Sequence, residues 1–459
     1  MTLSRYMSIG SALLVAMILT RLLSEDDFGA YRKLWLIYAI LGPALISSIA
    51  NTLYYRGNGE DRERAIFSNL IIGLFYGLGT GALAWVFAGF WAGQLNVYEL
   101  ENGFRLFAPY MALAVFSGIA EPLFVVINRK KWLLGYSAMY NTIESALIVV
   151  PFALGFDIET VVLIMSIGPA LRSIAVIVLA FSQTEKWPGF RSIFSELPIS
   201  LKYGFGIILL SLAGIAASEA DKWVIGSFFE SDALFAIYVI GAKKLPFITA
   251  LTSAVSAALV TEFATKLRSG DTASAVSQAS SASTRLTLIM LPLIAWLFIY
   301  AEEVMVLLFG KYEASAPVFR IYMLTVLSQL IFPQSITLGS GRSDINAKFG
   351  VAEVVLNISL SIFFVIQFGF LGAAFATLIS HFFFTGCLLW YCKRAYKINP
   401  KDLFPNKKVF LVTATLPLII FVGLSFKIFL DMSWLGFFST GMISAGLILL
   451  SLKKAGFKG

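Results

Sequence analysis

The sequence of residues 203–229 is YGFGIILLSLAGIAASEADKWVIGSFF. A helix needs about 20 predominantly apolar residues to cross a bilayer, and this stretch is long and apolar enough to do so. It nevertheless contains two adjacent charges, Asp221 and Lys222. A charge near the middle of a bilayer costs about 2.5–3.5 kcal/mol on insertion scales, and such residues are candidates for a functional site. The stretch therefore predicts a transmembrane helix that carries functional charges.

The composition of the whole chain is that of a membrane protein. Of the 459 residues, 58% are hydrophobic and only 14% are charged, and the mean hydropathy is +0.82. Soluble domains carry about 25% charged residues. We therefore expect an all-α, multi-pass membrane protein. The formal net charge is +8. We attribute it to membrane topology and expect no nucleic-acid partner, because no basic stripe with interleaved aromatic residues is present.

A window of about 20 residues, moved along the chain, predicts the number of transmembrane helices. Residues 1–23 are interpreted as the first span; a cleaved signal peptide is the alternative, but no small-residue cleavage site precedes Ser24. Residues 184–200 and 261–285 are expected to be linkers, the second flexible or surface-helical. The fourteen predicted spans are residues 6–23, 33–55, 66–92, 104–127, 133–155, 159–182, 203–229, 234–260, 286–309, 315–339, 346–368, 371–392, 408–428 and 433–452.

The distribution of Lys and Arg predicts the orientation of the chain, because cations near span ends are retained in the cytoplasm. With the N-terminus inside, most of the 35 basic residues fall on the cytoplasmic side, six of them within residues 393–408. We therefore predict that both termini are cytoplasmic. The cluster at 393–408 is interpreted as a topology signal beside the anionic inner leaflet, and recognition of a phospholipid is the alternative.

The outer loops of this topology are short and mostly acidic or neutral. An enzyme that polymerises or ligates glycans on the outer face is expected to hold its acceptor with a sizeable outer loop. The sequence also has no P-loop, metal motif or nucleophile constellation, and Cys387 and Cys392 match neither a disulfide framework nor a zinc site. We therefore predict that the chain is not an enzyme and uses no metal or cofactor; a membrane-embedded glycan polymerase or ligase remains an alternative.

A weak internal repeat relates the first six spans to spans seven to twelve. An acidic turn followed by an apolar-Ala-x-Tyr element occurs in residues 25–31 and again in residues 230–238. Glu144 and Glu353 occupy similar places in the two halves, although the spacings differ and chance is the alternative. Two such halves would have the same orientation, with a site at their interface. The predicted domains are six-helix lobes at residues 1–200 and 201–395, followed by two further transmembrane helices in residues 396–459.

Short motifs along nearly the whole chain carry a family resemblance. They are residues 20–31 (TRLLSEDDFGAY), 201–204 (LKYG), 221–226 (DKWVIG) with Tyr238, Pro333 with Gln334, Gly341 with Arg342, Asn357, and residues 369–377 (GFLGAAFAT). Each motif alone is weak. In this order and placement they resemble the Wzx-type polysaccharide (O-antigen) flippases of the multidrug/oligosaccharidyl-lipid/polysaccharide exporter (MOP, MATE-like) superfamily.

The resemblance implies a two-lobed bundle that alternates between inward-open and outward-open states. The implied cargo is an undecaprenyl-pyrophosphate-linked oligosaccharide, moved from the inner to the outer leaflet of a bacterial or archaeal cytoplasmic membrane for O-antigen, capsule or exopolysaccharide biosynthesis. An ion gradient would drive it, and other polysaccharide-assembly membrane proteins are possible partners. Fourteen spans, against the commoner twelve, resembles the lipid II flippases. A MATE-type drug or metabolite cation antiporter is the alternative, which the cations within the spans disfavour.

The cations within or near the spans fit a phosphate-bearing cargo. A pyrophosphate must lose its water as it crosses, and arginine or lysine would offset that cost through charge-assisted hydrogen bonds. Snorkelling toward the membrane surface is the alternative for Arg21 and Arg32, and a structural ion pair with Glu144 is the alternative for Arg172. The substrate-binding candidates are Arg21, Arg32, Arg172, Lys222 in span seven and Lys243 in span eight.

The acids and the single histidine within the spans fit a different task. A buried carboxylate can load a proton or sodium ion on one side of the membrane and release it on the other. Asp221 is the first candidate, and we expect Asp221 and Lys222 to find partners on other helices, because they lie about 100° apart on their own. An interhelical salt bridge is the alternative for Asp221, and a packing role for His381. The ion-coupling candidates are Asp221, Glu144, Glu353 and His381.

Overall fold

The computed structural model is helical throughout the residues that it describes. It is 89% helix, and the described residues contain no strand. Ten of the described helices are long and apolar enough to cross a membrane, or eleven if one bent pair counts as a span. The all-α, multi-pass membrane fold is therefore confirmed, whereas the predicted count of fourteen spans is not. The described residues are 2–57, 61–182, 184, 187–269, 271–405, 421–425, 427 and 433–454.

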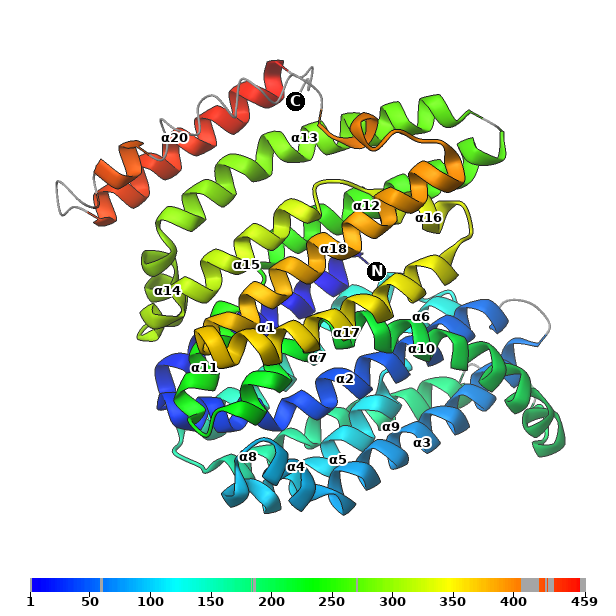
Figure 1. Ribbon diagram of the computed structural model, residues 1–459. Helices are drawn as coiled ribbons and strands as arrows, with labels where there is room; N and C mark the ends of the chain where they lie inside the picture. Colours follow the sequence, from blue (N-terminus) through cyan, green and yellow to red (C-terminus); the bar gives the residue numbers. More distant parts are fainter. Residues whose placement is uncertain are drawn as a thin grey trace. The chain divides into compact units, whose positions relative to one another are not determined.

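The chain forms two compact units, Met1–Ala236 and Ile237–Gly459. Its division into six-helix lobes at residues 200 and 395 stays a prediction, and most of the predicted span 408–428 lies outside the described residues. The helices of the first unit (Figure 1) are α1 (Thr2–Leu22), α2 (Glu25–Arg56), α3 (Arg62–Val86), α4 (Ala88–Gln94), η1 (Tyr98–Leu100), α5 (Glu101–Ser117), α6 (Ala120–Val126), α7 (Lys130–Ala153), α8 (Ile158–Met165), α9 (Ile167–Ser182), α10 (Phe190–Phe228) and the start of α11 (Asp232–Gly241).

The second unit is a further set of helices of the same kind. Two of them, α15 and α16, form the bent pair, with an angle of 49° at the break before Pro333. The helices after α11 are α12 (Pro246–Arg268), α13 (Thr272–Ile299), α14 (Ala301–Phe309), η2 (Tyr312–Ser315), α15 (Ala316–Ser328), α16 (Pro333–Gly339), α17 (Ser343–Phe368), α18 (Phe370–Tyr396), η3 (Pro400–Leu403) and α20 (Ser433–Lys454).

Three boundaries differ from the sequence-based prediction. The predicted span 234–260 is broken between α11 and α12, because Pro246 holds the preceding residue, Leu245, in an extended conformation. Of the two alternatives for the linker 261–285, the helical one describes most of it, but α12 and α13 extend into it from both sides, and α13 begins where the Asp271 side chain accepts a hydrogen bond from the Ser274 N–H (3.1 Å). The predicted linker 184–200 is also partly wrong, since α10 begins at Phe190.

The two stretches that the sequence pairs as a repeat are in contact within the first unit. The Asp26 carboxylate accepts a hydrogen bond from the backbone N–H of Ala233 (3.1 Å). The fully buried Lys33 ammonium lies 2.7 Å from the Asp232 carboxylate. A Cβ at Gly29 would lie 1.9 Å from the Asp232 carbonyl oxygen. The start of α2 is therefore packed directly on the turn that precedes α11, and only glycine fits at position 29.

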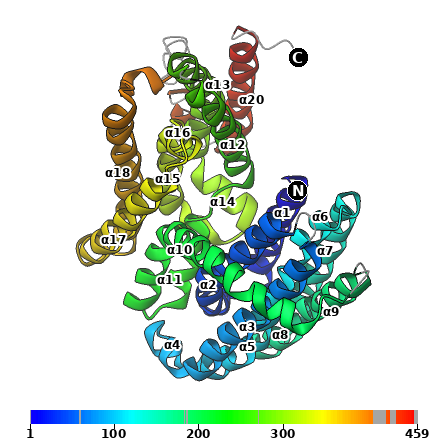
Figure 2. The ribbon, with the colours of Figure 1, turned by 90° about the vertical axis from the view of Figure 1, so that its right-hand side faces the viewer.

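In the second unit, α17 and α18 form a closely packed antiparallel pair (Figure 2). Gly369 joins them with a φ of 62°, a conformation that favours glycine. A Cβ at Gly372 would lie 2.2 Å from the Phe364 carbonyl oxygen. These two glycines of the 369–377 motif therefore make the turn and the close approach that bring the polar side chains of the two helices together.

Candidate functional site

The first unit contains a cavity of about 250 Å³ between α1, α2, α5 and α7. The cavity wall combines aromatic rings with hydroxyl, amide, carboxylate and guanidinium groups, which suits a polar or amphipathic ligand. Two of the predicted site residues, Arg32 and Glu144, are in this wall. The residues that line it are Ser8, Ser11, Ala12, Val15, Ala16, Leu19, Phe28, Tyr31, Arg32, Trp35, Tyr110, Asn141, Glu144, Ser145 and Ile148.

Arg32 lines this cavity and keeps one side-chain donor without a partner in the part of the chain that the structure describes. Its Nε is buried and has no hydrogen-bond partner among the described residues. A buried donor that stays unpaired costs about 1–3 kcal/mol, and more when the group is charged. An acceptor in the cavity would remove that cost. The arginine therefore marks the cavity as a place for an anion or for a ligand rich in oxygen atoms.

Glu144 is held in place by the cavity wall. The Tyr110 hydroxyl of α5 donates a hydrogen bond to the Glu144 Oε1 of α7 (2.8 Å). Tyr110 also belongs to an aromatic group, with its ring centroid 5.2 Å from that of Trp35 and 5.7 Å from that of Tyr38. These ring contacts position the Tyr110 hydroxyl, which in turn positions the Glu144 carboxylate. The carboxylate lines the cavity from α7, and Arg32 lines it from α2.

Hydrogen bonds between α1 and α7 form another side of the cavity. The Ser8 hydroxyl exchanges hydrogen bonds with the Asn141 side-chain amide (3.2 and 3.0 Å). The Ser11 and Ser145 hydroxyls lie 2.7 Å apart. Hydroxyl and amide groups at a cavity wall are able to exchange such bonds with the hydroxyls of a sugar. No sequence motif pointed to these four residues; a serine spacing of three on the first span is the one available signal.

Arg172 does not line this cavity. Its guanidinium carbon lies 4.4 Å from the ring centroid of Tyr140 and 6.0 Å from that of Tyr136, both on α7. Among the described residues, no ion pair joins Arg172 to Glu144, so the structural pair considered as an alternative is not formed. Cation–π contacts of this kind contribute about 0.5–2 kcal/mol. They hold α9 against α7, which is the helix that carries Glu144.

Asp221 and Lys222 differ in their surroundings, although they are adjacent on α10. Asp221 is fully buried. The Lys222 ammonium donates a hydrogen bond to the Ser218 carbonyl (2.7 Å) and lies 3.0 Å from the Glu219 carboxylate. The prediction that Lys222 finds its partner on another helix is therefore wrong, because an acid three residues earlier on the same helix is within reach of its long side chain. Sequence analysis overlooked Glu219.

The two remaining predicted cations lie near helix ends. Arg21 is exposed at the end of α1 and donates a hydrogen bond to the Met17 carbonyl of the same helix (2.7 Å). Lys243 was expected inside the eighth span. It lies instead in the break between α11 and α12, with its ammonium 6.0 Å from the ring centroid of Phe309. Neither residue lines the first-unit cavity.

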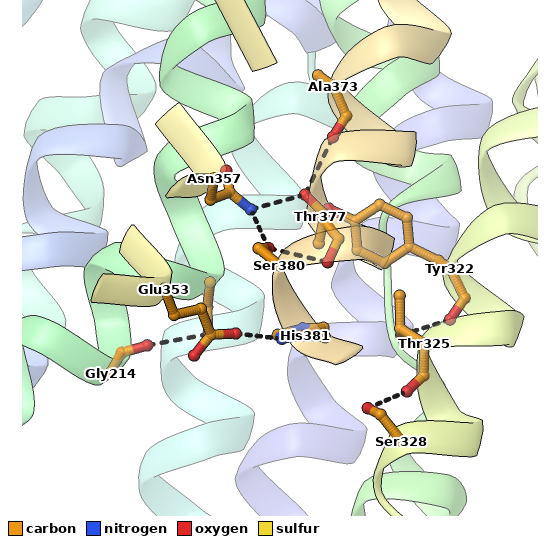
Figure 3. Close-up of polar contacts among 11 residues, drawn as sticks. Gly214, Tyr322, Thr325, Ser328, Glu353, Asn357, Ala373, Thr377, Ser380 and His381 are labelled. Atoms are coloured by element: carbon orange, nitrogen blue, oxygen red, sulfur yellow. Dashed lines mark hydrogen bonds and ion pairs between the residues drawn. The ribbon is translucent and has the colours of Figure 1, made fainter. Parts of the chain in front are cut away.

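In the second unit, Glu353 of α17 and His381 of α18 form a direct pair (Figure 3). The His381 Nδ1 lies 2.5 Å from the Glu353 Oε1, and the two side chains are 16% and 7% exposed. Next to them, the Asn357 amide nitrogen donates hydrogen bonds to the Thr377 hydroxyl (3.2 Å) and the Ser380 hydroxyl (3.0 Å). The sequence predicted both members of the pair as ion-coupling residues but not their contact.

Other charged pairs were missed because their partners lie far apart in the chain. The Arg56 guanidinium holds the buried Glu196 carboxylate with two hydrogen bonds (2.7 and 2.9 Å). Glu302 of α14 accepts hydrogen bonds from Arg320 (2.9 Å) and from Lys427. Burial opposes ionisation of Glu302, but these two hydrogen bonds prevail and hold its pKa below the usual value.

Comparison with known protein families identifies two matching models. The model described as "Polysaccharide biosynthesis protein" matches residues 18–317. The model described as "Lipid II flippase MurJ" matches residues 242–444. A curated relative, the probable low-salt glycan biosynthesis flippase Agl15 of Haloferax volcanii, is 26% identical over 293 residues. This match covers 60% of the chain and 58% of the relative, so it spans little more than half of that protein's length.

Solved structures of two transporter types are similar in fold. The lipid II flippase MurJ in an inward closed conformation has a TM-score of 0.74 at 15% identity, covering 98% of this chain and 96% of that one. The eukaryotic MATE transporter AtDTX14 has a TM-score of 0.63 at 15% identity, covering 88% and 94%. At such identity the likeness establishes the fold alone, which is the MATE-like fold expected from the sequence.

Proposed function

Because the chain belongs to the polysaccharide biosynthesis protein family, we propose that it translocates a lipid-linked glycan from the inner to the outer leaflet of the cytoplasmic membrane. Membership confirms the predicted family resemblance. The fold shared with flippases and MATE transporters is compatible with alternating access. The cargo in this proposal is an oligosaccharide on an undecaprenyl pyrophosphate carrier, for a surface polysaccharide such as O-antigen, capsule or exopolysaccharide.

The observation that carries the proposal is Arg32, which lines the first-unit cavity and whose buried Nε has no hydrogen-bond partner among the described residues. A pyrophosphate offers several strong acceptor oxygens and must lose its hydration as it enters a membrane protein. A charge-assisted hydrogen bond to a guanidinium contributes about 1.5–3 kcal/mol. The hydroxyl and amide groups of α1 and α7, together with the Trp35 ring, provide the surface that the first sugar would contact. A cavity of about 250 Å³ holds a head-group fragment rather than the whole cargo.

In this proposal, the other predicted cations do not bind the head group within the cavity. Arg172 positions α7 through its tyrosine contacts, and Lys222 would bind cargo only after release from Glu219. Arg21 and Lys243 lie near helix ends, where they would meet the head group before or after the cavity. Asp221 and Glu144 are the proposed first-unit residues for coupling to a proton or sodium gradient, since both are acids within membrane-spanning helices.

The experiment compares Arg32→Ala with Arg105→Ala. Arg105 is a matched control because it is exposed on α5 of the same unit and pairs with Glu101 four residues away. Display of the native polysaccharide is measured by lectin or antibody binding on cells that lack the chromosomal copy, at equal amounts of inserted protein. We expect Arg32→Ala to reduce display about tenfold or more, and Arg105→Ala to leave it unchanged. Full display by Arg32→Ala would overturn the proposal.

A cation antiporter is the second candidate function, because Glu144 and the aromatic rings of the same cavity would also suit a cationic ligand. The two candidates make opposite predictions for two substitutions. For an antiporter, Glu144→Gln abolishes drug or metabolite resistance and Arg32→Ala preserves it. For a glycan flippase, loss of Arg32 is the more damaging change. Measuring both variants for resistance and for display separates the candidates.

A further inference from the structure

We propose that Glu353 and His381 form a binding site for a single proton in the second unit, and that its loading and release accompany the transport cycle. The second half of this proposal rests on the proposed function. The pair joins α17 and α18 directly (Figure 3), and Gly369 and Gly372 bring the same two helices close together at the turn between them.

The distance within the pair determines where one proton must lie. The His381 Nδ1 and the Glu353 Oε1 are 2.5 Å apart, which is a hydrogen-bond distance. If Nδ1 carried no proton and the carboxylate were ionised, two lone pairs would face each other in a nearly dry site. A proton therefore lies between the two atoms. The simplest arrangement is a neutral imidazole with its proton on Nδ1, donating to the carboxylate.

A second proton can then be taken up at Nε2 without breaking a covalent bond. Before uptake, the pair consists of a neutral imidazole and a carboxylate, with a net charge of −1. After uptake, it consists of an imidazolium and a carboxylate, with a net charge of zero. Net charge in a low-dielectric environment is costly. Loading therefore lowers the cost of enclosing this part of the second unit, and release raises it, which is what a coupling site requires.

Among the described residues of the second unit, no other charged group is in contact with the pair. Among the described residues, neither Glu353 nor His381 has a second ion-pair or hydrogen-bond partner. The titratable groups on the elements packed against α17 and α18 are Arg320 and Tyr322 on α15 and Lys401 and Asp402 on η3, and α16 has none. On the two helices themselves, Asp344 pairs with Arg342 (2.9 Å). Lys348 lies more than one turn before Glu353. The titratable residues of α18 other than His381 all lie more than one turn after it: Cys387, Tyr391, Cys392, Lys393, Arg394 and Tyr396.

The polar network beside the pair holds it without adding charge. Asn357 links α17 to α18 through Thr377 and Ser380, and the Ser361 hydroxyl donates to the Asn357 side-chain oxygen (3.3 Å). These side chains are neutral at every physiological pH. They fix the register of the two helices while leaving the proton balance to Glu353 and His381.

His381 is the only histidine of the chain, so its protonation can be observed without assignment. The full chain, purified with a histidine-free tag, is labelled with ¹⁵N-histidine and placed in lipid nanodiscs. Spectra are recorded over a series of pH values. We expect a hydrogen-bonded proton on Nδ1 throughout the series, and a second proton on Nε2 only at its acid end. In Glu353→Gln we expect the hydrogen-bonded Nδ1 signal to be lost, whereas Glu353→Asp, which keeps the carboxylate, retains it.

The control is Glu313→Gln, which removes an exposed carboxylate of η2 in the same unit and should leave the spectrum unchanged. A proton on Nε2 alone in alkaline buffer, an Nδ1 signal unaffected by Glu353→Gln, or a spectrum that is the same in acid and alkali would each overturn the proton site. The spectrum is independent of cargo, so the site stands or fails separately from the proposed function.

The coupling half is tested by glycan display in His381→Gln and Glu353→Gln, with Glu313→Gln as the control. We expect about a tenfold loss of display in the first two variants at equal amounts of inserted protein. Undiminished display would overturn the coupling, while translocation by the chain would stand. If the wild-type chain supported no display, the proposed function would fail and the spectroscopic result would decide the proton site alone.

Discussion

The two units differ in the surroundings of the polar groups on their membrane-spanning helices. In the first unit, Arg32 lines a cavity and keeps a buried Nε without a hydrogen-bond partner among the described residues, and Glu144 is held at the same cavity by Tyr110. In the second unit, Glu353 and His381 satisfy each other without a cavity of comparable polarity among those described. In our proposals, the first arrangement binds a ligand and the second binds a proton. Burial alone does not distinguish the two cases.

Arg32 and Lys33 make the same contrast on adjacent residues of α2. Lys33 is fully buried, and its ammonium lies at ion-pair distance from the Asp232 carboxylate (2.7 Å), so it has an opposite charge beside it. Arg32 retains a buried Nε with no acceptor in the described residues. We therefore expect substitution of Lys33 to lower stability, and substitution of Arg32 to lower ligand affinity.

The largest expected effect is on stability, from Lys33→Met. Removing one member of a buried ion pair leaves the other charge unpaired and costs about 3–5 kcal/mol. We expect a matching loss in the free energy of unfolding, measured by denaturation of the purified protein in detergent. Adding Asp232→Asn should recover most of it, because no unpaired charge remains. Equal stability of Lys33→Met and wild type would remove the contrast with Arg32.

The next effect is on binding, from Arg32→Ala. We expect affinity for a short-chain polyprenyl pyrophosphate sugar to fall about tenfold to a hundredfold, equivalent to about 1.5–3 kcal/mol, with no loss of thermal stability. Isothermal titration calorimetry measures the first quantity and a melting curve the second. Arg105→Ala serves as the control. A destabilised Arg32→Ala protein with intact affinity would show that Arg32 is structural, like its neighbour.

Packing at the second-unit pair is tested by Gly372→Ala. The added Cβ would lie 2.2 Å from the Phe364 carbonyl oxygen, so α17 and α18 must move apart. We expect a loss of about 1–3 kcal/mol in the free energy of unfolding, and a weaker Glu353–His381 hydrogen bond in the ¹⁵N spectrum. Gly386→Ala on α18 meets nothing within 4 Å and is the matched control. If both variants behaved alike, the close approach would not be what holds the pair together.

The smallest effect concerns Glu302, whose pKa is held low by Lys427 and Arg320 despite burial. A carboxyl with a depressed folded-state pKa stabilises the protein above its unfolded pKa of about 4.3, and this contribution disappears as the pH falls through the folded value. Since the side chain is 31% exposed, screening limits the contribution to about 0–1 kcal/mol. Glu302→Gln should lower the melting temperature slightly at neutral pH, and the difference from wild type should shrink in acid. A difference that grows in acid would contradict this.

The sequence was sufficient for the fold class and the family. Apolar stretches of the right length determine that helices cross the membrane, because the bilayer leaves no other way to satisfy the backbone. The motifs at residues 20–31 and 369–377 pointed to the correct family. Within them, Gly29, Gly369 and Gly372 lie where a side chain would collide or strain the backbone. Helix breaks, as before Pro246 and Pro333, shifted the boundaries.

The sequence also identified Glu144, Glu353 and His381 as polar residues within predicted spans, where a charge is costly, and Arg32 as a cation at the outer end of a span. Only the tertiary structure decided which partner each one has. Glu353 meets His381 across a helical hairpin, Lys33 meets Asp232 from a distant turn, and Lys222 turns back to Glu219 on its own helix. Which side chains meet depends on the register and the spacing of packed helices, and neither can be derived from one sequence alone.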